Sequence, residues 1–133
     1  MKLNNLELLN AYIALNTIAK EKLPMMLSYQ IEMIRDYIEP FAKTVDGMIL
    51  EIKKRHAATN PVSGEFIYAK DANGNSLPNT LVLEDVKEAE KEINEFLIQQ
   101  LEVPPVKVKI SLFPNDFRIS ADTLRLMKGI IEL

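Results

Sequence analysis

The sequence predicts an α+β protein: mainly a helical bundle built on one long kinked helix, with a small antiparallel sheet. Three patterns carry this prediction. Apolar residues recur at helical spacing between residues 27 and 52, and again between residues 84 and 101. Between residues 106 and 113 apolar and polar residues alternate, which is typical of a half-buried strand. The 133 residues fit a single domain spanning 1–133.

A first helix is expected over about residues 5–20. Asn4 and Glu7 have the spacing of a capping box, in which a short polar side chain and a glutamate satisfy each other's backbone amides. Pro24 then suits the first turn of the next helix, where a missing amide hydrogen costs nothing.

The second helix carries a hydrophobic ladder: Leu27, Ile31, Ile34, Ile38, Phe41, Val45, Met48 and Ile52. A second row (Met26, Met33 and Tyr37) flanks the ladder, so we expect the N-terminal half to be covered on two sides. Pro40 lies inside the pattern and predicts a kink or a break there, because proline removes one helical hydrogen bond.

The ladder has two interpretations, a self-associating coiled coil and a bundle within one chain. Coiled-coil seams are usually bordered by charged pairs. The borders here are mostly uncharged: Ser28, Gln30, Arg35, Tyr37, Ala42, Thr44, Ile49 and Glu51. This favours the bundle, while dimerisation near Ile49 and Ile52 stays open.

The rest of the chain predicts shorter elements. Strands are expected at 65–69 and 80–83, joined by a turn at Asp71 to Ser76, and a helix at 84–101. A strand over 106–113 follows Pro104 and Pro105, and Ser120 is placed to cap a last helix carrying Leu124, Met127, Ile130 and Ile131. The strands of 65–83 and 106–113 are expected to form the small antiparallel sheet against the helix at 84–101.

Composition narrows the class of function. The net charge of −3 disfavours nucleic acid, because strong phosphate binders carry a basic excess or a basic face. The chain has no cysteine, which excludes disulfides and thiolate chemistry and suits the cytoplasm. No apolar run reaches the roughly 18–20 residues that a bilayer span needs, so no membrane association is predicted.

Two basic segments are the candidate interaction surface: Lys53, Lys54, Arg55 and His56, with Lys107 and Lys109. The first also suits a helix C-terminus, whose dipole favours cations, and such a charge run is more often a solvated cap than a binding site. His56 is the one histidine, and the sequence names neither a nucleophile nor an orienting carboxylate for it.

No catalytic, metal or cofactor site is predicted. Asp71, Asn73 and Asn75 imitate the start of a calcium loop, but the required glycine and final glutamate are missing. The carboxylates between residues 84 and 95 alternate with Lys87 and Lys91, as on a solvated helix face. The four scattered glycines form no phosphate-binding loop, so an enzyme is not expected.

The order of segments resembles a family of small, uncharacterised proteins of tailed bacteriophages and prophages. The resemblance rests on the opening MKLNNLELLN, the helix from LPMMLSYQIEMIRDYIEPF to ILEIKKRH, the DANGN tip, EDVKEAEKEINEFLIQQLEV and the final SADTLRLMKGIIEL. It implies a phage origin and residence in the cytoplasm of the infected bacterial host. It implies no activity and no functional residues.

These observations together predict a non-enzymatic phage accessory protein that binds a host or phage protein. Two alternatives remain open: a homo-oligomeric structural or assembly protein that uses the ladder as a homodimer, and a weak nucleic-acid-binding protein that uses the two basic segments.

Overall fold

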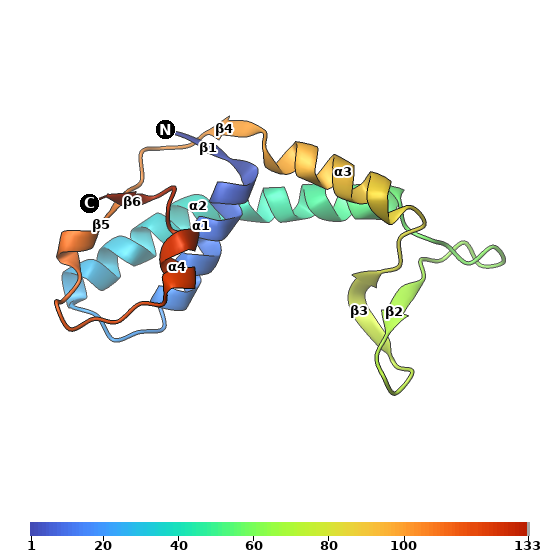
Figure 1. The fold of residues 1–133 in the computed structure, drawn as a ribbon, viewed down its shortest axis with the longest axis horizontal. Helices are drawn as coiled ribbons and strands as arrows, with labels where there is room; N and C mark the ends of the chain where they lie inside the picture. The colour runs from blue at the N-terminus through green and yellow to red at the C-terminus, as the bar shows by residue number, and fades with distance from the viewer. Residues whose placement is uncertain (133) are drawn as a thin grey trace. The chain divides into compact units, whose positions relative to one another are not determined.

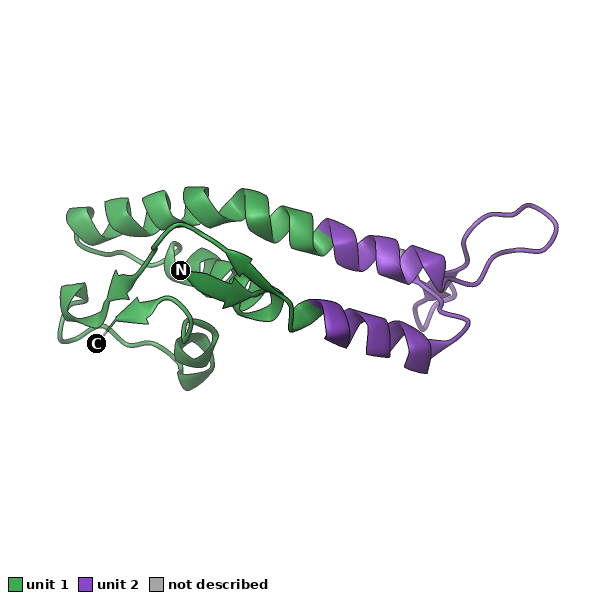
Figure 2. Ribbon diagram, turned by 90° about the horizontal axis from the view of Figure 1, so that it is seen from above, with its two compact units in different colours: residues 1–46, 97–133 green, residues 47–96 purple. Residues whose placement is uncertain are grey.

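The computed structural model describes residues 1–132, apart from the side chains of residues 78 and 79. Figure 1 shows the course of the chain and its elements. The chain divides into two compact units, coloured separately in Figure 2. Unit 1 consists of Met1–Asp46 and Leu97–Leu133, and unit 2 consists of Gly47–Phe96. The division falls inside the longest helix, immediately before Gly47, a residue that weakens helices.

Unit 1 contains most of the helical core. Its elements are β1 (Lys2–Asn4), α1 (Asn5–Ile18), the first part of α2 (Met25–Arg55), β4 (Gln100–Glu102), β5 (Val108–Lys109), a short 3-10 helix (Ile110–Leu112), α4 (Ala121–Leu126) and β6 (Ile131–Glu132). The largest fully buried side chains all lie here: Leu8, Leu15, Ile18, Ile31, Ile38, Val108, Met127 and Ile130. Unit 1 is therefore built around aliphatic packing of α1, α2 and the C-terminal segment.

The predicted capping box at the start of α1 is confirmed. The Glu7 amide donates to the Asn4 side chain (2.7 Å), and the Asn4 amide donates to the Glu7 carboxylate (3.0 Å). The Tyr12 hydroxyl then joins α1 to α2 by donating to the Glu39 carboxylate at 3.1 Å.

α2 runs from Met25 to Arg55 as one helix with Pro40 inside it, so a break at Pro40 was the wrong prediction. The alternative, a kink, stays a prediction. Pro40 and Asp36 are both exposed, so water can satisfy the Asp36 carbonyl that loses its helical donor. The Thr44 hydroxyl donates to the Pro40 carbonyl at 2.9 Å, which adds a polar contact one turn later.

The ladder of α2 packs inside the molecule, whereas its flanking row does not. Leu27, Ile31, Ile38, Val45 and Ile52 are buried, and Met48 is the exposed member of the ladder. The predicted covering of Met26, Met33 and Tyr37 was wrong, because each is at least half exposed. Helical periodicity marks both rows as apolar, but the chain supplies packing partners for only one of them.

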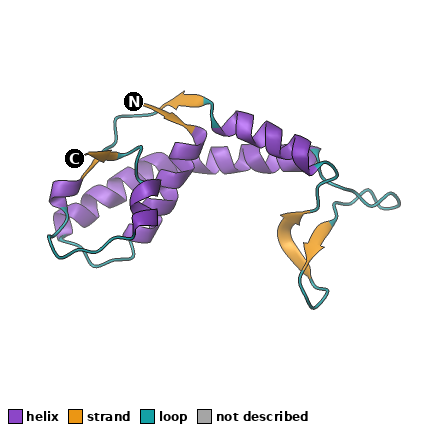
Figure 3. Ribbon diagram, in the orientation of Figure 1, coloured by secondary structure: helices purple, strands orange, loops and turns teal. Residues whose placement is uncertain are grey.

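The fold is mixed α+β with small antiparallel sheets, as predicted, but residues 65–83 and 106–113 do not join in one antiparallel sheet. The structure has three separate two-stranded sheets instead, and Figure 3 shows how short their strands are. β5 is reduced to Val108–Lys109 and pairs in parallel with β6, while residues 110–112 turn into the 3-10 helix. Pro104 and Pro105 have no amide hydrogen to offer a sheet, which limits the strand on its N-terminal side.

Two helix ends also differ from their predictions. The helix expected at 84–101 is α3 (Val86–Leu97), and residues 100–102 pair with β1 in antiparallel fashion. The last helix begins after Ser120, whose hydroxyl accepts from the Thr123 amide (3.1 Å), as predicted. It ends at Leu126 because Ile130 and Ile131 turn toward β5, where the Val108 amide donates to the Ile130 carbonyl at 2.7 Å.

Unit 2 contains the last turns of α2, the hairpin of β2 (Tyr68–Lys70) and β3 (Ser76–Leu81), and α3 up to Phe96. The hairpin and its turn are confirmed. β2 begins later than the strand predicted at 65–69, and β3 begins earlier than the strand predicted at 80–83. Asp71 accepts from the amides of Asn73 (2.9 Å) and Asn75 (3.0 Å), and Gly74 has a φ of 82°. The Asp71 carboxylate thus closes the turn, as expected for a hairpin tip rather than a calcium loop.

Candidate functional site

Most basic side chains at the C-terminal end of α2 form ion pairs within unit 2. The Glu92 carboxylate of α3 contacts the Arg55 guanidinium at 2.5 Å and the His56 ring nitrogen Nε2 at 2.6 Å. The His56 carbonyl also accepts from the Glu84 amide at 2.8 Å. Glu92 therefore fixes α3 to the end of α2. Lys54 also pairs with Glu51 (3.5 Å), so three of the four basic residues at this helix end have an internal partner.

The same contacts set the electrostatics of this cluster. The hydrogen bond from His56, followed by the charge of Arg55, holds the pKa of Glu92 below its usual value against the effect of partial burial. His56 has a carboxylate to orient it, which sequence reasoning missed. Within the described residues no hydroxyl side chain hydrogen-bonds to its ring, so the arrangement lacks the nucleophile of a catalytic triad.

Lys107 and Lys109, the other predicted interaction residues, belong to unit 1. The neighbouring Val106 and Val108 are buried, so the alternating backbone turns both lysines to the surface. They line a groove of about 390 Å³ between α2 and residues 105–112, together with Gln30, Met33, Ile34, Tyr37, Pro105, Val106 and Leu112. The groove is thus mainly apolar with a cationic border.

An exposed apolar stripe runs along α2 beside this groove. It consists of Met25, Met26, Tyr29, Met33 and Tyr37, whose side chains are 50–82% exposed. Residues 25, 29, 33 and 37 are four apart, so they follow one another along a single helix face. We call these five residues the Met/Tyr stripe. The spacing was visible in the sequence, but periodicity gave no sign that this row would stay uncovered.

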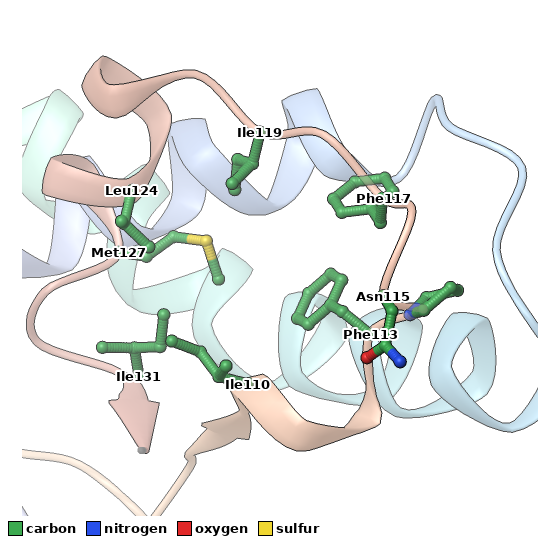
Figure 4. A pocket seen from close by; sticks show the side chains of 9 residues that line it. Ile110, Phe113, Asn115, Phe117, Ile119, Leu124, Met127 and Ile131 are labelled. Atoms are coloured by element: carbon green, nitrogen blue, oxygen red, sulfur yellow. The ribbon is translucent and has the colours of Figure 1, made fainter.

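A second hollow in unit 1 is apolar and uncharged. Figure 4 shows it between α4 and the segment 110–119, with Met127 pointing into the space. It encloses about 290 Å³, and the rings of Phe113 and Phe117 stack at its rim with centroids 5.2 Å apart. Its polar lining side chain is Asn115, so it offers apolar contact and no acid–base chemistry.

The part of the chain that the structure describes contains no cluster of histidine, aspartate and glutamate suited to a metal ion. Its helices include none that is both long and apolar enough to span a bilayer. Of the six predicted interaction residues, Lys53 in unit 2 and Lys107 and Lys109 in unit 1 form no ion pair with the residues described. The predicted basic surface is therefore two small groups in different units.

Comparisons with protein-family models, with curated proteins and with solved structures each gave no match.

Proposed function

We propose that this chain is a non-enzymatic phage accessory protein that binds a host or phage protein in the cytoplasm of the infected bacterium. The binding surface is the Met/Tyr stripe of α2 with the adjoining groove. The observation that carries the proposal is the exposure of five large apolar side chains on one face of one helix. Continuous apolar exposure of this kind marks interaction sites, because water disfavours it on an isolated protein.

The residue types in the stripe suit a protein partner. Methionine and tyrosine are enriched in the buried centres of interfaces. Methionine is flexible and polarisable, so it adapts to an uneven partner surface, and tyrosine combines a large apolar ring with a hydroxyl that tolerates water. A stripe of both residues can therefore remain in water in the free chain and provide apolar contact area in a complex.

The platform beneath the stripe also supports the proposal. Leu27, Ile31 and Ile38, on the neighbouring face of α2, are almost completely buried. They hold this part of the helix in place, so binding need not order it first, and a preorganised surface loses less entropy on association. The same burial favours packing of the ladder within one chain over a coiled coil between chains.

The experiment is capture from a bacterial lysate with four immobilised baits: wild type, Met33→Glu, Tyr37→Glu and a control, Val62→Glu. Val62 is 95% exposed and lies in unit 2 away from the stripe residues in sequence. A charge buried without a partner costs several kcal/mol, so we expect both stripe variants to lose the captured protein at least about tenfold. The Val62 variant should retain it.

Equal capture by all four baits would contradict the proposal, as would capture that depends on Val62 alone. Light scattering on the purified chain distinguishes the homodimer alternative. Association of the wild type that the stripe variants abolish would show a second copy to be the partner, and the assembly function would then replace the accessory function.

A further inference from the structure

The groove beside the Met/Tyr stripe has a charge of one sign along its edge. Lys107 and Lys109 line it, and no carboxylate does. Neither lysine forms an ion pair with any residue that the structure describes. Three other cations of unit 1 are paired: Lys43 with Glu39 (3.0 Å), Arg35 with Glu32 (3.1 Å) and Arg125 with Asp122 (3.3 Å). Lys20 and Lys128, which lie outside the groove, also form no ion pair with the residues described.

The opposite border of the stripe differs in charge. Each helical residue advances about 100°, so Ile34 and Gln30 face the groove side while Asp36 and Glu32 lie across the stripe from it. Glu32 is paired within the helix, and Asp36 is exposed. The surface is thus an apolar strip with two lysines lining the groove side and acidic groups on the other side. Glu132 stands beside Lys109 on the paired strand β6 but does not line the groove.

From this charge arrangement we propose that the occupant is an acidic amphipathic helix of the partner protein. The proposal rests on the proposed function and specifies its partner. Apolar side chains of that helix cover Met33 and Tyr37 and enter the groove toward Leu112. Carboxylates on one flank of the helix meet Lys107 and Lys109. Helices docked in this way present apolar anchors at spacings of three and four residues.

The size of the groove fits such an anchor. Its volume of about 390 Å³ lies at the low end of the roughly 300–1,000 Å³ range of ligand sites. It has space for one or two large apolar side chains but is too open to enclose a drug-sized molecule. The two lysine side chains have long apolar stems, so they cover the edge of an inserted anchor while their ammonium groups reach a carboxylate.

The test is a display selection from random helical peptides of about 18 residues, long enough for several helical turns, with the full chain as bait. The second bait is Lys107→Glu/Lys109→Glu. The matched control is Lys20→Glu/Lys128→Glu, which makes the same charge change at two exposed lysines of unit 1 outside the groove. A fourth bait, Met33→Glu, disrupts the apolar surface.

We expect the wild type and the control to enrich peptides with apolar residues at helical spacing and an excess of Asp and Glu. The groove variant should enrich Lys and Arg instead, and Met33→Glu should enrich neither. Replacing the glutamates of an enriched peptide by glutamine should weaken its binding by about five- to tenfold, as expected for two partly exposed ion pairs.

Three results would overturn the inference, and they separate it from the proposed function. In the first, the groove variant and its lysine control enrich peptides of the same charge while Met33→Glu enriches none. That result would reject the acidic partner and keep the stripe as the binding surface. Enrichment of the same peptides by the wild type and by Met33→Glu would reject the stripe as the binding surface as well. Absence of peptide enrichment, with a dimer that Met33→Glu dissociates, would make a second copy of the chain the occupant.

Discussion

The two units of this chain are stabilised in different ways. Unit 1 holds the largest fully buried side chains, whereas the buried apolar side chains among the described residues of unit 2 are Ile52 and two alanines, Ala57 and Ala89. Unit 2 relies more on polar contacts, with Glu92 joined to Arg55 and His56, and on an exposed hairpin. A well-packed unit is the better platform for a permanent binding surface, and the Met/Tyr stripe lies on that unit.

The largest expected effect is on the core of unit 1. Leu15→Ala should lower the free energy of unfolding by about 2–5 kcal/mol, because Leu15 is fully buried and its loss leaves a cavity. Ile93→Ala in unit 2 should cost only about 1 kcal/mol, because Ile93 is partly exposed. Urea unfolding followed by circular dichroism measures both, and equal losses would show that the two cores are alike.

Two glycines of unit 2 should respond in opposite directions. Gly74→Ala should destabilise the hairpin by roughly 1 kcal/mol, because its φ of 82° is unfavourable for a residue with a Cβ. Gly47→Ala should stabilise the chain by about 1 kcal/mol, since α2 is helical there and an added Cβ meets nothing within 4 Å. Melting temperatures of the two variants should therefore move apart, and a lower melting temperature for Gly47→Ala would argue against a continuous helix at the boundary.

The contacts of Glu92 should make unit 2 sensitive to acid. The pKa of Glu92 is lowered in the folded chain, so the ionised carboxylate favours folding. This contribution to stability is complete when the pH is above 4.5, the ordinary pKa of a glutamate. It is lost as the pH falls through the lower pKa that Glu92 has in the folded chain. Hydrogen exchange of the Glu84 amide, which donates to His56, should show decreasing protection over that interval.

Glu92→Gln is the control for this acid response. It should reduce protection of the Glu84 amide at neutral pH and remove the further loss below pH 4.5. An acid response that persists unchanged in the glutamine variant would assign the effect to another carboxylate.

The smallest expected effect is on the stability of the folded chain when a residue of the stripe is replaced. Met33→Gln removes an exposed methionine, so the free energy of unfolding should change by no more than about 0.5 kcal/mol. A thermal melt measures this change. A loss of several kcal/mol would mean that Met33 is covered in the folded chain, and the stripe would then be part of the core.

Local signals made the helices predictable. The capping box at Asn4 and Glu7, the cap at Ser120 and the ladder of α2 each act within a few residues, and the structure confirms them. The turn at Asp71 to Asn75 is local in the same way, because one carboxylate closes it.

The features that were missed depend on partners far away in the sequence. Lys2 pairs with Glu102, and Ile131 pairs with Val108. The alternation around Val108 predicted a strand there, but the composition of its partner β6, and of β1 and β4, gave no such signal. His56 and Glu92 meet across the intervening hairpin, which no spacing rule foresees. The stripe was missed for a related reason: periodicity marks apolar rows, but only tertiary packing decides which of them is covered.

We propose that another protein docks on the Met/Tyr stripe. Photo-crosslinking in bacterial cells tests it most directly, with a photoreactive amino acid placed in turn at residues 29, 33 and 37, and at residue 62 as the exposed control. We predict one common crosslinked protein from the three stripe positions and none from residue 62. Crosslinks only from residue 62, or the same products from all four positions, would contradict the claim.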